Sequence, residues 1–305
     1  DTKVAVVARN VDIVASGTLD NGLVAGAALK LQLGDDEGNA LNTGDDATFS
    51  EVYTFLEGGF GRVELGATDG AAFKMHYTSP WFVPGNGVDS PNIYNMQNGA
   101  VSVSSRSSTF SFTPDAGTND PVGGGFGLSA TNSAVENVFE FAANYAGEFG
   151  GASVGVDVFY VTGDAPGVGA DDPEEKGVGA SLGWGGFTLG GAYTQADNLA
   201  AGAQGIGSVQ NISNAATRGN QADTWTVGLA YGTGPWTVGA AYFDSTTENA
   251  TGANLGENSF IQVGGGYSLG AGVDVGLDVQ LIEDQIGAAP AVDSTSAGVV
   301  LAISF

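Results

Sequence analysis

The sequence predicts an all-β fold, a transmembrane antiparallel up-and-down β-barrel, and three observations support this prediction. Apolar residues alternate with small or polar ones in segments of about ten residues, which is the pattern that barrel strands require. Hydrophobic residues make up 42% of the 305 residues, yet no run approaches the ~18 apolar residues of a membrane-spanning helix. The chain also ends on an alternating strand whose last side chain is aromatic.

This final strand would be unusual in a soluble domain, whose termini generally fray in water. A closed sheet in a membrane needs such a strand, because every strand is paired on both sides and presents apolar side chains to lipid. One face of the strand consists of Ala297, Val299, Leu301, Ile303 and Phe305.

Read in order, the alternating segments give fifteen strands, whereas single-chain bacterial barrels have an even number. Either a strand before Asp1 is absent from the sequence, or the segment from Lys3 to Leu19 holds two short strands. We expect sixteen strands and a single barrel over residues 1–305. The fifteen segments are 3–18, 23–34, 47–58, 61–69, 100–113, 124–132, 137–147, 152–163, 176–185, 187–197, 223–232, 236–245, 258–269, 272–283 and 295–305.

Three strands repeat one aromatic motif, which indicates the two edges of an apolar band. An aromatic residue opens each strand and a tyrosine follows six residues later, about 20 Å along an extended chain. Small residues rather than charges occupy the opposite face, which argues against a soluble β-sandwich with an aromatic core. The expected interface aromatics are Phe187, Tyr193, Trp225, Tyr231, Trp236, Tyr242 and the terminal Phe305.

Other strands place carboxylates on the second face alone, as Asp157 does between Val156 and Val158. That face therefore meets water, and in a closed barrel this means a wet lumen. Short turns alternate with long polar loops, which barrels place on opposite sides of the membrane. The long loops cover 35–46, 70–99, 164–176, 199–222, 245–258 and 284–295.

Composition excludes several classes of function. The formal net charge of -26 argues against nucleic acid as a partner, because phosphates require basic patches. The chain has no cysteine and one histidine, His76, for which no triad is evident, so we expect no enzyme and no required cofactor. Acidic stretches at 35–37 and 171–175 could hold Ca²⁺ through oxygen ligands, with simple solvation as the alternative.

Several segments resemble the general diffusion porins of alphaproteobacteria, the Rhodobacter type. They are residues 16–27 (SGTLDNGLVAGA), 57–66 (EGGFGRVELG), the Trp/Phe-Thr-Val/Leu-Gly-x-Ala-Tyr hairpins and the ending at Phe305. The resemblance implies sixteen strands, one of them before the strand that matches 11–17. It also implies a homotrimer in the outer membrane of a Gram-negative bacterium, in contact with the bilayer and lipopolysaccharide. No signal peptide is visible at Asp1, so it has been removed or was never there.

In such porins the long third loop folds into the barrel and narrows the pore, and the matching stretch is 70–99. Alternation places Lys30, Arg62 and Glu64 toward the lumen, since their neighbours are apolar. Arg9 and Arg106 are further candidates on strands. For these two residues, and also for Lys30 and Arg62, solvated charges near strand ends are the alternative. The loop and its base add Asp69, Lys74, His76 and Asp89. In the family, acidic residues of the third loop face basic residues of the barrel wall, whereas the loop 70–99 of this chain has few acidic residues.

We therefore expect a non-enzymatic, water-filled channel for passive diffusion of small hydrophilic solutes and ions, with weak cation preference. Two alternatives stay open. A substrate-specific channel would use the aromatic residues of the loop, Phe73 to Tyr94, as a slide for sugars. A structural or adhesive barrel would have a plugged lumen.

Overall fold

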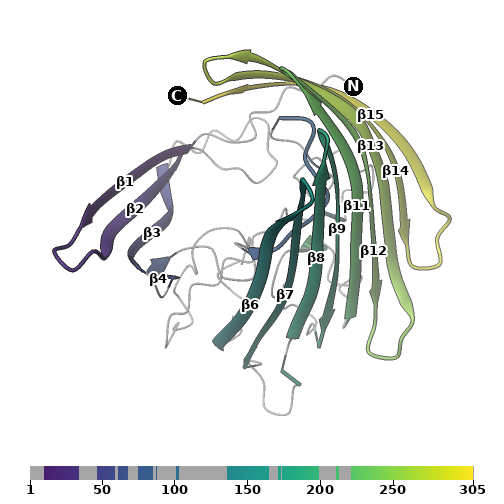
Figure 1. Ribbon diagram of the computed structural model, residues 1–305. Helices are drawn as coiled ribbons and strands as arrows, with labels where there is room; N and C mark the ends of the chain where they lie inside the picture. The colour runs from purple at the N-terminus through teal and green to yellow at the C-terminus, as the bar shows by residue number, and fades with distance from the viewer. Residues whose placement is uncertain are drawn as a thin grey trace.

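The computed structural model shows an antiparallel β structure whose largest sheet is strongly curved (Figure 1). It describes residues 10–33, 47–58, 61–67, 75–84, 87, 101–102, 136–164, 171–172, 174–198, 211–212 and 221–304. Among these residues no helix is long and apolar enough to cross a membrane.

The strands of the described residues form three sheets, in which every hydrogen-bonded pair is antiparallel. The four-stranded sheet contains β1 (Asn10–Thr18), β2 (Val24–Leu33), β3 (Ala47–Gly58) and β4 (Gly61–Ala67) in sequence order. The two-stranded sheet pairs β5 (Val101–Ser102) with β10 (Asn211–Ile212).

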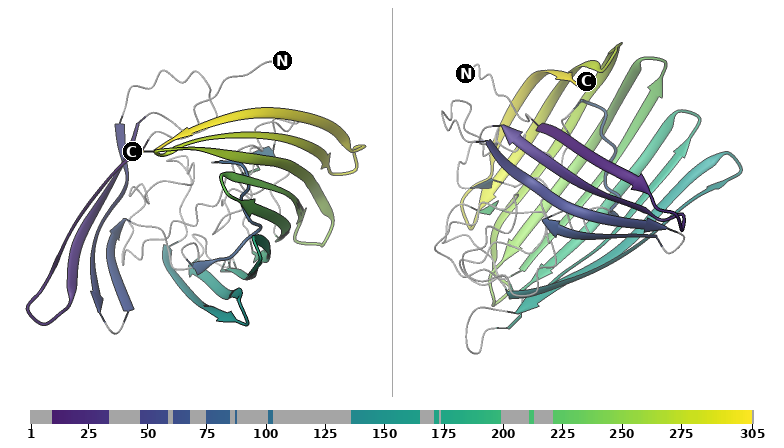
Figure 2. Two further views of the ribbon diagram at one scale, coloured as in Figure 1. Left: turned by 45° about the horizontal axis from the view of Figure 1, so that its top comes forward. Right: turned by 90° about the vertical axis from the view of Figure 1, so that its left-hand side faces the viewer.

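The nine-stranded sheet follows the chain strand by strand, except that β9 lies beside β11. Its strands are β6 (Glu136–Phe149), β7 (Ala152–Asp164), β8 (Glu174–Trp184), β9 (Phe187–Asp197), β11 (Gln221–Thr233), β12 (Trp236–Glu248), β13 (Asn254–Gly270), β14 (Val273–Ile286) and β15 (Val292–Ile303). The four-stranded sheet lies across from this sheet (Figure 2). The up-and-down antiparallel fold class is thus confirmed.

The two faces of the nine-stranded sheet differ in chemistry, as the alternation predicts. On β11, Thr224, Thr226 and Ala230 are buried, whereas Trp225 and Leu229 between them are exposed. The same period of two runs through β7, β8, β13 and β14. We call the face with the buried small and polar residues the inner face, and the exposed apolar one the outer face. An apolar surface this large and continuous is what a lipid-facing wall requires.

In the four-stranded sheet, the pairing register places charged residues together on one face. Lys30 lies opposite Glu51, and Glu57 lies opposite Arg62. A register shift between Lys30 and Leu31 marks a bulge, where one residue of β3 is skipped in the pairing. Because of this bulge, Phe49 and Val52 are both exposed although three positions separate them.

Two tight turns explain how neighbouring strands stay in register. Gly150–Gly151 and Gly185–Gly186 all have positive φ, from +58° to +87°. Two consecutive residues of this kind match the type I′ turn, whose twist suits a hairpin. The strand predicted at 187–197 has these bounds in the structure.

Several predicted long loops are shorter than expected. The loop predicted at 245–258 is wrong, because β12 continues to Glu248 and β13 begins at Asn254. The loop predicted at 284–295 is likewise reduced to the residues between Ile286 and Val292. Most residues of these strand ends are polar on both faces, so the alternation that identified the strand centres is lost there.

The strand count of sixteen stays a prediction. The expected strand at 124–132 lies outside the described residues, and so does the one at 100–113 apart from Val101 and Ser102. The same holds for residues 1–9, the first part of the segment 3–19, in which two short strands were the alternative to a strand before Asp1.

Candidate functional site

A segment of the longest predicted loop, residues 75–84, lies against the inner face of the nine-stranded sheet. We call it the inner segment. Near its start it contacts Asp157 on β7, whose side chain is 1% exposed. The Asp157 carboxylate lies 2.8 Å from Nδ1 of His76 and accepts a hydrogen bond of 2.6 Å from the backbone N–H of Tyr77. The His76 ring also packs edge-on against Phe159, with centroids 4.9 Å apart. This end of the inner segment is therefore held by a buried carboxyl group.

Glycines on the inner face allow the inner segment to lie close to the sheet. A methyl carbon added to Gly155 would come within 2.5 Å of the Tyr77 ring, and one on Gly276 within 2.6 Å of Pro84. Successive strands supply such positions for successive residues of the segment. We call this set the glycine track: Gly155 on β7, Gly179 on β8, Gly190 on β9, Gly228 on β11, Gly239 on β12, Gly264 and Gly266 on β13, and Gly276 on β14.

The far end of the inner segment is anchored by apolar burial. Phe82 and Val83 are 3% and 1% exposed and belong to one hydrophobic cluster. In this cluster the rings of Phe243 and Phe260 stack with centroids 5.0 Å apart. The remaining members are Ala230, Ala241 and Ile282. Burying a side chain of this size contributes about 1.5–3 kcal/mol, so Phe82 is a strong attachment point.

The inner face also carries buried polar side chains on β13 and β14. The Asp278 carboxylate accepts hydrogen bonds from the side-chain amides of Gln262 and Gln280, at 2.8 Å and 3.0 Å. Buried carboxylates that accept several hydrogen bonds are stabilised in place. This group therefore acts as part of a fixed polar wall.

The polar face of the four-stranded sheet brings together acids and bases. Lys30 forms an ion pair of 3.1 Å with Glu51. Arg62 pairs with Glu64 at 2.8 Å and with Glu57 at 3.3 Å. Its guanidinium also lies 3.8 Å from the centroid of Phe55, a cation–π contact. Each of these two basic groups is fixed beside a carboxylate, so the wall presents both signs of charge within a few ångströms.

The expected pore-lining residues are thus partly placed. Arg62 and Glu64 are in direct contact, and the register places Lys30 on the same face of the four-stranded sheet. His76, on the inner segment, contacts Asp157 on the nine-stranded sheet. The other candidates lie outside the described residues: Arg9, Asp69, Lys74, Asp89 and Arg106.

Sequence reasoning missed the partners Glu51, Glu57 and Asp157 as site residues. For Asp157 a signal existed, since it interrupts an apolar alternation on its strand. For Glu51 the sequence gives no such signal. The bulge beside it interrupts the period of two by which residues are assigned to the two faces of a strand.

The expected interface aromatics lie on the outer face in two groups. At the short-turn end, Phe187 packs on Tyr231 and Trp236 on Tyr267, each with centroids 4.5 Å apart. Toward the other end, Trp225 packs on Tyr242 at 4.8 Å and lies opposite Tyr193 in register. Trp225 does not open its strand as expected, because β11 begins four residues earlier at Gln221. Phe305 lies outside the described residues.

Within the described residues, no three His, Cys, Asp or Glu side chains are grouped so that they could hold a metal ion. Of the two acidic stretches considered for Ca²⁺, residues 35–37 lie outside this part of the chain. In the second stretch, Glu174 is engaged by Tyr160 and Lys176. Calcium binding stays a prediction.

Comparisons with known proteins agree with this architecture. The model of the Gram-negative porin family matches residues 2–286 of the chain. Among solved structures, OmpF of Salmonella typhi in complex with daunomycin is 14% identical, with a TM-score of 0.59, over 96% of this chain and 89% of that chain.

In-vitro folded OmpT, an outer membrane protein of Vibrio cholerae, is 13% identical, with a TM-score of 0.56, over 97% and 88% of the two chains. A porin refined at 1.8 Å is 18% identical, with a TM-score of 0.51, over 97% and 92%. No curated protein sequence matches the chain significantly. The structural likenesses show the fold, and the family match extends over nearly the whole chain. The chain therefore belongs to the Gram-negative porin family of outer-membrane β-barrel channels.

Proposed function

We propose that this porin is an open, water-filled channel for passive diffusion of small hydrophilic solutes and ions, narrowed by the loop 70–99. The observation that carries the proposal is the inner segment, which crosses the polar face of the sheet and is fixed at both ends, by Asp157 and by Phe82. A loop fixed on the wall narrows a lumen without having to block it. The family implies that the channel assembles as a homotrimer.

Weak cation preference is the second part of the proposal. The polar face of the four-stranded sheet carries Asp12, Glu51, Glu57 and Glu64 against Lys30 and Arg62. The net charge of the chain is also strongly negative. Charged rings in a pore favour ions of the opposite sign, and the two basic groups reduce this preference locally.

Single-channel conductance in a planar bilayer under a salt gradient tests the proposal. Large steps in groups of three and a reversal potential that indicates mild cation preference are expected. Silent insertion would contradict the open channel and favour the plugged barrel. Solute-saturable block would favour the substrate-specific channel, an alternative supported by the 44% exposure of Trp81 on the inner segment.

The basic groups can be tested separately. Lys30→Gln with Arg62→Gln should shift the reversal potential further toward cations, because the carboxylates beside them lose their counter-charges. The shift should grow at low salt, where screening is weaker. Lys176→Gln is the matched control, since Lys176 is also paired with acids but lies on the outer face with Tyr160. Equal reversal potentials in the double variant and the unmodified protein would refute this placement.

A further inference from the structure

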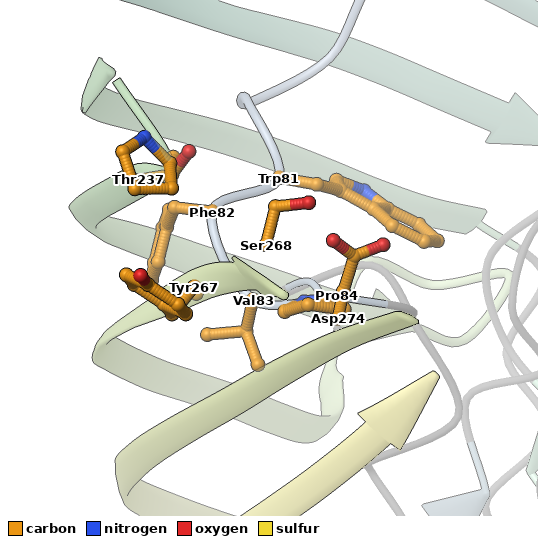
Figure 3. A pocket seen from close by; sticks show the side chains of 10 residues that line it. Trp81, Phe82, Val83, Pro84, Thr237, Tyr267, Ser268 and Asp274 are labelled. Carbon is orange, nitrogen blue, oxygen red and sulfur yellow. The ribbon is translucent and has the colours of Figure 1, made fainter. Parts of the chain in front are cut away.

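A pocket of about 280 Å³ lies where the inner segment meets the short-turn end of the sheet (Figure 3). The inner segment contributes Trp81 and Pro84, and the turn before β12 contributes Pro235. Ser268 and Asp274 line the pocket from the facing ends of β13 and β14, where they are paired in register. The pocket is thus built by two parts of the chain that are far apart in sequence.

Flat apolar surfaces dominate the lining. Trp81 is 44% exposed, and the edge of its indole ring lies close to Gly87. Two proline rings and the buried Phe82 and Val83 complete the apolar part. Pockets with a mostly apolar lining and a few convergent polar groups are typical of small-molecule sites.

The polar side chains among the lining residues are one carboxylate and three hydroxyls, those of Thr237, Tyr267 and Ser268. The Asp274 carboxylate points toward the side of the pocket where Trp81 lies (Figure 3). Within the described part of the chain it forms neither a hydrogen bond nor an ion pair. A carboxylate and an indole ring that line the same pocket favour a cation, because both attract positive charge.

Other ligand classes fit less well. An anion would be repelled by Asp274 and by the net charge of -26. A sugar carries several hydroxyl groups, and each one left without a hydrogen-bond partner in the pocket weakens binding. Four polar side chains in an otherwise apolar pocket cannot satisfy them all. An organic ammonium ion has a single polar group, and its apolar body matches the prolines and the indole.

We propose that this pocket binds small organic ammonium ions with a ring-sized apolar body. The short turns of such barrels lie on the periplasmic side, so the site stands at the periplasmic mouth of the channel. The inference extends the proposed function in that solutes would reach the site through the lumen. Binding itself does not require that the channel conducts.

Binding is measured by isothermal titration calorimetry and ligand-observed NMR on the folded full-length protein in detergent. The probe is benzylammonium, and benzyl alcohol is its neutral counterpart of similar shape. Benzylammonium is expected to bind, and benzyl alcohol to bind at least about tenfold more weakly. Asp274→Asn should weaken benzylammonium binding about tenfold and leave benzyl alcohol unchanged. Trp81→Leu should weaken both.

Asp293→Asn is the matched control, because it removes the same charge from an exposed position near the start of β15, away from the pocket. Far-UV circular dichroism verifies that each variant is folded. Equal binding of both probes, or no loss in Asp274→Asn, would overturn the proposal. Glucose binding that depends on Asp274 would instead assign the pocket to sugars and overturn the ammonium class.

The same protein is then inserted in a planar bilayer. Benzylammonium added on the side of the short turns should increase open-channel noise in the unmodified protein and less so in Asp274→Asn. Calorimetric binding without any conductance would refute the open channel and leave the pocket standing. Conductance without calorimetric binding would refute the pocket alone.

Discussion

At the scale of single residues, the attachment of the inner segment depends on Asp157. This carboxylate accepts from the Tyr77 backbone and contacts the His76 ring while almost fully buried. Removing it takes the partner from two half-buried polar groups, at about 0.5–1.5 kcal/mol for each hydrogen bond. The attachment is local, so the strands themselves should persist.

We predict that Asp157→Ala releases this end of the inner segment. The chain has no cysteine, so Ser79→Cys introduces a single reporter at a position that is 2% exposed. The reporter should react slowly with a thiol reagent in the parent and at least about tenfold faster after Asp157→Ala, since ~1.4 kcal/mol corresponds to tenfold in an opening equilibrium. Asp20→Ala, in an exposed turn, is the control. Equal labelling rates in all three backgrounds would mean that Asp157 does not hold the segment.

At the scale of elements, the glycine track shows why the sheet tolerates a chain lying on it. A methyl carbon at Gly179 would clash with the backbone oxygen of Tyr77 and with the Asp157 carboxylate. Backbone atoms cannot rotate away as a flexible side chain does. One methyl group therefore has to displace the inner segment or bend β8.

We predict that Gly179→Ala lowers the free energy of unfolding by about 1–3 kcal/mol, the usual cost of overpacking. Urea titration in detergent measures the change. Gly17→Ala on β1 is the control, because an added methyl carbon there meets no atom within 4 Å. If the two variants were equally stable, the close packing of the inner segment on Gly179 would be refuted.

The elements also show what could be predicted from the sequence. Strand centres such as Phe187–Asp197 were predictable, because one face is apolar and the other small or polar. The strand ends around Glu248 and Asn254 were not, since both faces are polar there and resemble a loop. The pairing of Lys30 with Glu51 depends on a bulge that alternation cannot show. The contact of His76 with Asp157 joins residues 81 apart in sequence, and only the folded sheet brings them together.

At the scale of the whole molecule, the outer face defines where the chain meets lipid. Its centre is apolar, with Leu229 on β11 lying opposite Leu189 on β9 and Ala240 on β12. Beyond the aromatic group that contains Tyr242, the same face becomes acidic. There Thr246 lies opposite Asp223 and Glu257. One face of one sheet therefore passes from an apolar band to a charged rim.

This gradient predicts that the cost of a charge depends on its position along the strand. Leu229→Arg should lower the free energy of unfolding in phospholipid vesicles by about 2–4 kcal/mol, the cost of arginine at the bilayer midplane. Thr246→Arg is the matched variant and should cost about 0–1 kcal/mol, as at a membrane interface. The acids beside Thr246 would offset even this cost by pairing with the new guanidinium. Urea unfolding in the same vesicles compares both variants with the parent. Only a lipid environment makes the free-energy cost of an arginine depend on its depth in the membrane. Equal costs at the two positions would therefore mean that the outer face does not span a hydrocarbon layer.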